Sequence, residues 1–143
     1  FGGIAVHIIN SKEQLISILE ILNFSNRSFL AQKKLTIISD CRLYIADFRF
    51  LTCLKRIPQN NSSLGNIAKG ASSIEFIPPE FVINYSIQMA KKLGAEFLCV
   101  DWFETESGEF IFNEIETAGG FVQLPNPGRQ LVAKNLFRWK NNE

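Results

Sequence analysis

The sequence has little of what marks several common classes of protein. It contains three cysteines and one histidine, and no two of the cysteines form a C-x-x-C pair. An odd number of cysteines without such a pair indicates neither a disulfide framework nor a thiolate zinc site. We therefore expect Cys41, Cys53 and Cys99 to be reduced thiols within a core.

An excess of charge and a long apolar run are also missing. The 15 Lys and Arg residues nearly balance the 14 Asp and Glu residues, and the formal net charge is +1. No overall field therefore attracts nucleic acid or anionic lipid. The apolar runs are far shorter than the roughly 20 residues that a membrane helix needs. The sequence thus predicts no nucleic-acid partner and no membrane partner.

The first ten residues contain neither a basic leader nor a small-residue cleavage site. This pattern argues against a secretory signal, and we expect a cytoplasmic protein. The length of 143 residues and the hydrophobic content of 46% suit one compact unit with a packed core.

Hydrophobic periodicity predicts both helices and strands. A capping-box pair, Ser11 and Gln14, precedes apolar residues at helical spacing, which is the pattern of a helix N-terminus. Helices are predicted over residues 12–22, from residue 80 to a cap at Gly94, and over residues 131–139. Strands are predicted over residues 4–9, 28–33, 36–39, 96–104 and 109–116, and residues 42–56 are expected to form a hairpin turning near Ala46 and Asp47.

Residues 58–73 differ from the rest of the chain because Asn, Ser, Gly and Ala dominate them. This composition predicts a long irregular loop, and loops of such length are usually functional or disordered.

Three carboxylates give the strongest chemical signal. If Ser107 and Gly108 form a two-residue turn, Asp101 lies directly opposite Glu114, so the two side chains share a face. Glu116 lies two residues further along the same strand, and the period of two places it on that face too.

Neighbouring anions within apolar strands are costly unless a cation offsets them. Mg²⁺ is the natural candidate, because it binds one or two carboxylates together with phosphate oxygens. The alternative is a solvated acidic face that pairs in part with Lys91 or Lys92. A slip of one residue would turn a whole strand over and favour that alternative.

Basic residues in the middle third could serve the phosphates. Arg42, Lys55, Arg56 and Lys69 belong to this set, together with Asn66 between two glycines. Guanidinium and ammonium groups and glycine-exposed amides bind phosphate oxygens well. Taken singly, each of these basic residues is more often a solvated surface charge, and we assign no role to His7.

The order of these motifs resembles the C-terminal half of the ATP-grasp ligases, and within them the RimK-like peptide and glutamate ligases. Phe1-Gly2-Gly3-Ile4-Ala5-Val6 resembles the end of the glycine-rich loop over the nucleotide phosphates. Phe29-Leu30-Ala31-Gln32-Lys33-Lys34-Leu35 is similar to the hinge strand that holds adenine.

The remaining motifs follow in the family's order. Asp40-Cys41-Arg42 resembles the family's Asp-x-Arg, and Arg56 falls where a second arginine closes that hairpin. Gly65-Asn66-Ile67-Ala68-Lys69-Gly70 is similar to the asparagine-bearing loop. Val100-Asp101 resembles the strand with the first metal carboxylate, and Asn113-Glu114-Ile115-Glu116 resembles the Glu-x-Asn that completes the metal site.

The resemblance implies an α+β fold, the C-terminal portion of an ATP-grasp domain with a mainly antiparallel sheet and flanking helices. Residues 1–34 would be the remainder of the glycine-loop subdomain, and residues 35–143 would carry the phosphate and metal site. The implied cofactors are ATP and Mg²⁺ or Mn²⁺. The implied metal ligands are Asp101, Glu114 and Glu116; the catalytic residues are Arg42, Arg56 and Asn66; the nucleotide contacts are Gly2, Gly3, Gln32, Lys33, Leu35 and Lys69.

The implied reaction is ATP-dependent joining of a carboxylate and an amine through an acyl phosphate. The substrates would be an amino acid or peptide carboxylate and an amine, and closure of a peptide into a macrocycle uses the same activation. Glu116 stands where the family usually has asparagine, and the chain starts inside the glycine-rich loop. A non-catalytic nucleotide-binding or scaffolding module is therefore the alternative. We also expect either a fragment that lacks an N-terminal domain or a homo-oligomer.

Overall fold

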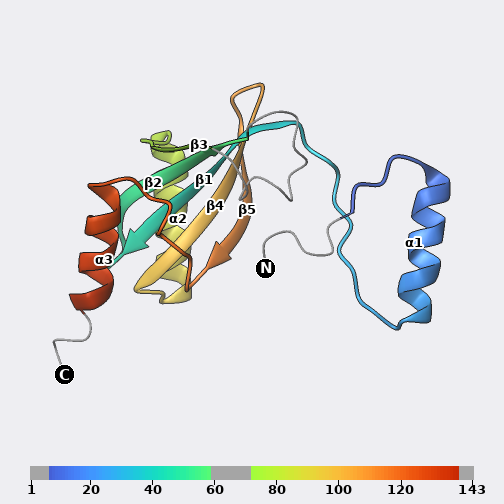
Figure 1. Cartoon of the computed structure of the whole chain (residues 1–143). Coiled ribbons are helices and arrows are strands. Elements are labelled where there is room, and N and C mark those ends of the chain that lie inside the picture. The colour runs from blue at the N-terminus through green and yellow to red at the C-terminus, as the bar shows by residue number, and fades with distance from the viewer. Residues whose placement is uncertain (1–6, 59–71, 139–143) are drawn as a thin grey trace. The chain divides into compact units, whose positions relative to one another are not determined.

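The structure of the chain, a computed structural model, describes residues 7–58 and 72–138. The chain divides into two compact units, Phe1–Leu35 and Thr36–Glu143. Figure 1 shows the first unit with its helix, and the second unit with the sheet and the helices that cover it.

The first unit contains helix α1 (Lys12–Phe24). The Ser11 hydroxyl accepts a hydrogen bond from the Gln14 N–H at 3.2 Å, and Gln14 Oε1 accepts one from the Asn10 N–H at 2.8 Å. These bonds satisfy free N–H groups at the start of the helix, as the capping box predicts. The predicted helix is confirmed and ends two residues later than expected.

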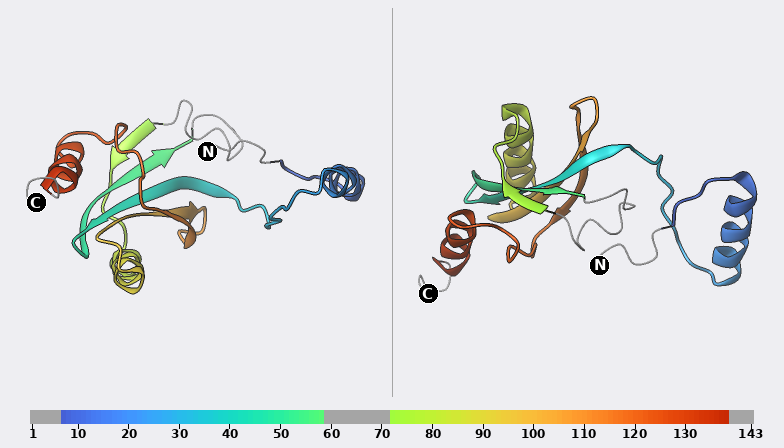
Figure 2. Two further views of the ribbon diagram at one scale, coloured as in Figure 1. Left: turned by 90° about the horizontal axis from the view of Figure 1, so that it is seen from below. Right: turned by 45° about the horizontal axis from the view of Figure 1, so that its top comes forward.

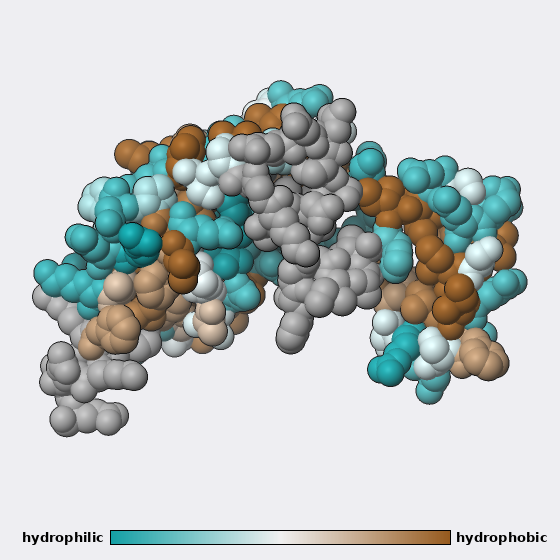
Figure 3. All heavy atoms as spheres, in the orientation of Figure 1, coloured by the Kyte–Doolittle hydropathy of each residue, from teal (hydrophilic) through white to brown (hydrophobic). Residues whose placement is uncertain are grey.

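The two strands predicted in this unit are not seen in the part of it that the structure describes. Residues 7–9 and 28–33 have no regular secondary structure, and residues 4–6 lie outside the described residues. Without a neighbouring strand, an apolar β-branched run has no ladder to join, and its preference for strand is weak. Helix α1 buries none of its residues, and Figure 3 shows hydrophobic side chains at the surface of this unit.

The second unit is built on a five-stranded sheet in the order β3-β2-β1-β4-β5. Every neighbouring pair is antiparallel. The strands are β1 (Ile37–Ala46), β2 (Arg49–Ile57), β3 (Ser72–Glu75), β4 (Phe97–Thr105) and β5 (Phe110–Glu116). With the helices, this sheet confirms the α+β prediction.

The hairpin of β1 and β2 turns at Asp47 and Phe48, one residue beyond the predicted centre. Both residues have positive φ angles, 48° and 58°, which is the geometry of a type I′ turn. The extended structure predicted over residues 36–39 is confirmed from Ile37 onward, but it is not a separate piece, because β1 continues without a break through Ala46.

Strand β3 corrects the prediction of a loop over residues 58–73. Ser72 and Ser73 belong to this strand, which pairs with β2. Serine has no marked preference for strands, so the extended conformation of these two residues depends on their pairing with β2. Residues 59–71 lie outside the described residues.

Two helices lie on opposite faces of the sheet (Figure 2). Helix α2 (Glu80–Leu93) is confirmed, with Gly94 as its left-handed C-cap at φ 61°, a conformation that costs glycine little. Helix α3 (Gly128–Arg138) begins three residues before the predicted start.

Each helix covers its own core. Val82 and Ala90 of α2 pack in one cluster with Cys41, Leu43 and other inward residues of the sheet. On the opposite face, Val132 of α3 joins a second cluster with Tyr44, Leu54 and Cys99. All three cysteines are free and buried. Among the residues that the structure describes, no helix has the length and apolar character needed to cross a membrane.

Candidate functional site

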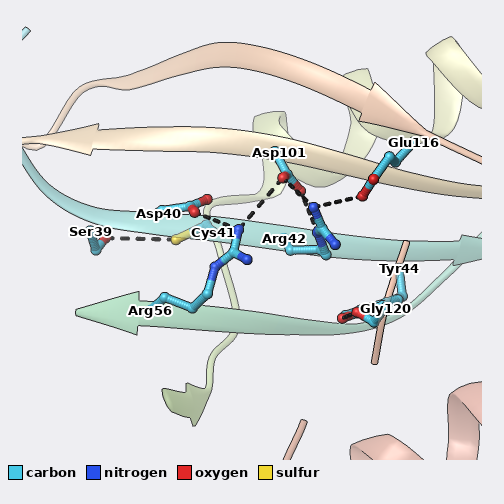
Figure 4. A network of polar contacts seen from close by, with 9 residues as sticks. All are labelled: Ser39, Asp40, Cys41, Arg42, Tyr44, Arg56, Asp101, Glu116 and Gly120. Carbon is cyan, nitrogen blue, oxygen red and sulfur yellow. Dashed lines mark hydrogen bonds and ion pairs between the residues drawn. The ribbon is translucent and has the colours of Figure 1, made fainter. Parts of the chain in front are cut away.

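A group of charged side chains, most of them largely buried, lies on the face of the sheet opposite α2. Strand β1 directs Cys41, Leu43 and Ile45 toward the α2 core. Because side chains alternate along a strand, Asp40 and Arg42 point to the other face. Figure 4 shows the group, which we call the Arg42 network: Asp40, Arg42, Arg56, Asp101 and Glu116.

Arg42 is the centre of this network. It lies opposite Asp101 in the β1–β4 ladder, and its guanidinium binds that carboxylate through two bonds, Nε to Oδ1 at 2.8 Å and Nη2 to Oδ2 at 2.7 Å. The same Nη2 lies 2.8 Å from Glu116 Oε2. Burial disfavours the charged guanidinium, but the bonds and charge of Asp101 outweigh this effect, so the pKa of Arg42 is raised.

The second arginine links two carboxylates less evenly. Arg56 lies opposite Asp40 in the β1–β2 ladder and forms an ion pair with it. Its Nη2 is 3.5 Å from Asp101 Oδ2. Arg42 and Arg56 therefore approach the same oxygen of Asp101 from two neighbouring strands, which explains how an acidic residue that is only 3% exposed remains compensated.

Asp40, next to Arg56, has a raised pKa. Burial raises its pKa to about 6, and the negative charge of Asp101 adds to this, whereas Arg56 and Arg42 oppose it. One of its oxygens, Oδ1, and the Nε of Arg56 are buried and have no hydrogen-bond partner among the described residues. Unsatisfied polar atoms and shifted pKa values gather at functional sites more often than elsewhere.

The hairpin of β4 and β5 confirms the predicted pair but not the predicted turn. The ladder closes with Thr105 N–H donating to Glu109 O at 3.0 Å, and Gly108 has a φ of 79°, so the loop has three residues rather than two. Trp102 consequently faces Phe112. A bulge between Asp101 and Trp102 then shifts the pairing back by one residue, so that Asp101 lies opposite Glu114 as predicted.

The two glutamates of β5 differ in what their side chains contact. Glu116 is half exposed, with 47% of its side chain accessible, and it reaches Arg42. Glu114 is exposed, and no other described residue forms an ion pair or a side-chain hydrogen bond with it. Within the described residues, Asp101 and Glu116 thus converge on Arg42, whereas Glu114 does not contact it.

The donor set can be tested for its fit to Mg²⁺. Within residues 7–58 and 72–138, no three side chains of His, Cys, Asp or Glu are grouped closely enough to hold a metal ion. Two carboxylates, however, direct hard oxygens at one cationic nitrogen, Nη2 of Arg42. Mg²⁺ usually takes one or two carboxylates and fills its other positions with water and phosphate oxygens. Asp101 and Glu116 therefore fit a shared Mg²⁺.

The segment after β5 covers the other side of Arg42. Gly119 is buried, and a Cβ at this position would lie 2.5 Å from Cys99 Sγ and 3.3 Å from Arg42 Nη1. The Tyr44 hydroxyl donates to Gly120 O at 2.8 Å. Burial raises the pKa of the Cys99 thiol to about 12, so this thiol is a neutral part of the packing.

Lys55 is separated from the network, because it lies on the α2 face of the sheet. Its Nζ is 2.5 Å from Glu104 Oε2 and 4.5 Å from the centre of the Phe76 ring, and Ser39 also donates to Glu104. Burial alone would raise the pKa of Glu104, but these partners outweigh it and the pKa is lowered. The predicted basic set is thus divided between two faces.

The other predicted site residues fall into two groups. Gln32 and Lys33 are exposed and Leu35 is half buried, all three in the first unit. Gly2, Gly3, Asn66 and Lys69 lie outside the described residues. Asp40 and Gly119 were not among the predicted site residues. Strand alternation with Arg42 could have identified Asp40, whereas the tight contact at Gly119 has no sequence signal.

No family model matches the chain. The chain is similar to two curated proteins, both described as uncharacterized. One is MG011 of Mycoplasma genitalium, 30% identical over 128 residues, which cover 86% of this chain and 43% of that protein. The other is its homologue in Mycoplasma pneumoniae, 29% identical over 150 residues, 99% of this chain and 51% of that protein. The chain spans about half the length of these relatives.

Solved structures show the fold. An ATP-grasp ligase associated with peptide modification in Chryseobacterium gregarium, in complex with ADP and a leader and core peptide, aligns with a TM-score of 0.65 and 14% identity. The alignment covers 92% of this chain and 42% of that one. The macrocyclase MdnC of Microcystis aeruginosa, bound to its precursor peptide, aligns with a TM-score of 0.64 and 19% identity, over 90% of this chain and 41% of that one.

A third structure, the ATP-grasp ligase PsnB with its minimal precursor, Mg and ADP, aligns with a TM-score of 0.55 and 15% identity, over 73% of this chain and 34% of that one. The chain therefore has the fold of a portion of the ATP-grasp ligases.

Proposed function

We propose that this chain supplies the metal-binding and phosphate-binding part of an ATP-dependent carboxylate–amine ligase. One observation supports this most: Asp101 and Glu116 converge on a single cation, with a second arginine 3.5 Å from Asp101, on one face of a sheet with the ATP-grasp fold. Such a site offers both signs of charge that a nucleotide triphosphate and its metal need.

Each residue of the network has a distinct role in this proposal. Asp101 and Glu116 would hold Mg²⁺, and Glu114, which lies in β5 with Glu116, would be a third oxygen donor. The metal would neutralise charge on the phosphates. Arg42 and Arg56 would bind the transferring phosphoryl group and the oxygens of the acyl phosphate, because guanidinium groups match phosphate in geometry. Asn66 and Lys69, outside the described residues, would assist them.

The nucleotide would also contact Gly2, Gly3, Gln32, Lys33 and Leu35, as the likeness to the family implies. The acyl donor would be a peptide or amino acid carboxylate, since the ligase of Chryseobacterium gregarium is described with a leader and core peptide and PsnB with a minimal precursor. MdnC is described as a macrocyclase, and a reaction that closes a peptide ring within one substrate would use the same activation of a carboxylate.

The test measures ADP formation by the complete protein with candidate peptides and amines. The test variants are Asp101→Asn, Glu114→Gln and Glu116→Gln. The matched control is Glu104→Gln, because Glu104 lies in the same strand as Asp101 but forms its ion pair on the opposite face of the sheet. Loss of one metal carboxylate should lower turnover by at least about 100-fold, comparable to removing a key electrostatic group in other sites. Unchanged turnover in both Asp101→Asn and Glu114→Gln would refute the proposal.

A second function is favoured by the bidentate pair itself. Arg42 already neutralises Asp101 and reaches Glu116, an arrangement that stabilises the sheet without metal. The chain would then belong to a nucleotide-binding or scaffolding protein with no turnover. Calorimetry with ATP and Mg²⁺ separates the two functions, because tight binding without ADP formation across peptide and amine substrates supports the module.

A further inference from the structure

The same nitrogen of Arg42 contacts both carboxylates that fit a metal. Nη2 lies 2.7 Å from Asp101 Oδ2 and 2.8 Å from Glu116 Oε2. A hard cation that took these two oxygens would have to replace the guanidinium, since two positive charges cannot share them at such distances without strong repulsion. The location that suits Mg²⁺ is therefore filled by a side chain of the protein.

We propose that Arg42 is a displaceable counter-ion, which competes with the divalent cation for Asp101 and Glu116 and makes metal binding depend on the nucleotide. This inference rests on the proposed function. Without nucleotide, Arg42 keeps the two carboxylates compensated and the metal affinity low. When the phosphates arrive, they offer the released guanidinium a new anionic partner, so metal and nucleotide bind together.

The surroundings of Arg42 support this role. Its side chain is 11% exposed, so the charge needs an anionic partner at all times. Asp101 has a second arginine nearby, with Arg56 Nη2 at 3.5 Å, and Glu116 is half exposed to solvent. Glu116 can therefore release Arg42 at little cost, and Asp101 is never left without a compensating charge.

The experiment measures binding of Mn²⁺ to the complete protein, by the electron paramagnetic resonance signal of the free ion, with and without ADP. Arg42→Gln should raise the Mn²⁺ affinity of the nucleotide-free protein about tenfold or more, because the competing cation is removed. Arg42→Lys keeps the charge but loses the two-pronged contact, and its affinity should lie between those of the wild type and Arg42→Gln.

Two controls separate competition from a general change of charge. Lys55→Gln removes a cation from the opposite face of the sheet, where Lys55 pairs with Glu104, and it should leave Mn²⁺ affinity unchanged. Arg56→Gln removes the same charge from the network but leaves the contacts of Arg42 in place, and its effect should be clearly smaller than that of Arg42→Gln. Equal effects of Arg42→Gln and Arg56→Gln would overturn the inference.

A wild-type measurement covers the case in which the Arg42 variants fail to fold. The side-chain Nε–H of Arg42, which donates to Asp101 at 2.8 Å, should show a shifted nuclear magnetic resonance signal and faster hydrogen exchange after addition of Mg²⁺ and ADP. An unchanged signal with bound metal overturns the inference but leaves the proposed function intact. Absence of any metal binding, with or without ADP, overturns both.

Discussion

Asp40 lies opposite Arg56 across the β1–β2 ladder, and the two form a buried ion pair. One carboxylate oxygen and the guanidinium Nε of this pair have no hydrogen-bond partner within residues 7–58 and 72–138. This incomplete pairing leaves burial as the dominant influence on Asp40, whose pKa rises to about 6. A group that is harder to ionise when folded makes stability depend on pH.

The sign of this dependence follows from the raised pKa. Between the ordinary pKa of 3.8 and about 6, Asp40 holds its proton in the folded state but loses it in the unfolded state. Its contribution to stability is present in full below about pH 4 and disappears as the pH rises through 6. A shift of this size corresponds to about 3 kcal/mol.

Other carboxyls titrate in the same range, so the measurement compares the wild type with Asp40→Asn. The difference between their free energies of unfolding, from urea titrations, should change between pH 4 and 6 and remain constant from pH 7 to 8. Parallel curves over the whole range would show that Asp40 has an ordinary pKa in the folded state.

The contact of Gly119 with Cys99 gives a second prediction. Gly119→Ala would place a Cβ 2.5 Å from Cys99 Sγ and 3.3 Å from Arg42 Nη1, and overpacking of this kind costs about 1 to 3 kcal/mol. The next residue provides the control, because a Cβ at Gly120 meets nothing within 4 Å. Gly120→Ala should be neutral or slightly stabilising. The measurement compares the midpoints of denaturant unfolding of the two variants, and equal midpoints would contradict the prediction.

The sequence was sufficient for features set by local patterns. Helix α2 follows from its apolar spacing and Gly94, and the position of the first hairpin turn follows from the residues around Asp47. The pair Asp101 and Glu114 was predicted correctly from a wrong turn, because the extra loop residue near Gly108 and the bulge after Asp101 cancel each other. Neither irregularity has a distinctive sequence signal, and each alone would have reversed the face of β5.

Features that depend on packing could not be predicted from the residues. Ser72 and Ser73 belong to strand β3 because they pair with β2. The partners of Arg42 likewise depend on how the strands pair in the folded sheet. The sequence suggested Asp101 with Glu114 as the principal pair. In the structure, Arg42 instead contacts Asp101 and Glu116, because Asp101 Oδ2 and Glu116 Oε2 both lie close to its Nη2.

A third prediction concerns Trp102 and Ser86, which join β4 to α2. The Trp102 indole N–H donates to Ser86 Oγ at 3.0 Å, and that hydroxyl donates to Val82 O at 2.8 Å. Ser86→Ala leaves the buried indole N–H without an acceptor, at a cost of about 1 to 3 kcal/mol. In a Trp102→Phe background the same substitution should cost clearly less. Urea unfolding followed by circular dichroism measures all four proteins, and equal costs in both backgrounds would show that this bond contributes nothing.

The last prediction compares two buried ion pairs, one from each face of the sheet. Arg42 and Asp101 have side chains 11% and 4% exposed and share two hydrogen bonds, whereas Lys55 and Glu104 are each 15% exposed and share one contact. Without Arg42, Asp101 keeps only the approach of Arg56 at 3.5 Å, and without Asp101, Arg42 keeps only the half-exposed Glu116. Arg42→Met or Asp101→Asn alone should therefore cost on the order of 3 kcal/mol.

The double variants then give the coupling within each pair. For Arg42 and Asp101 we expect about 2 kcal/mol, near the upper part of the range for directly interacting residues. For Lys55 and Glu104 we expect about 1 kcal/mol, because an ammonium group lacks the fixed fork of a guanidinium. Denaturant titrations of the complete protein at pH 7 provide both cycles. Since the two pairs have similar burial, a larger coupling for Lys55 and Glu104 would mean that the two-pronged geometry of Arg42 has no energetic advantage in this sheet.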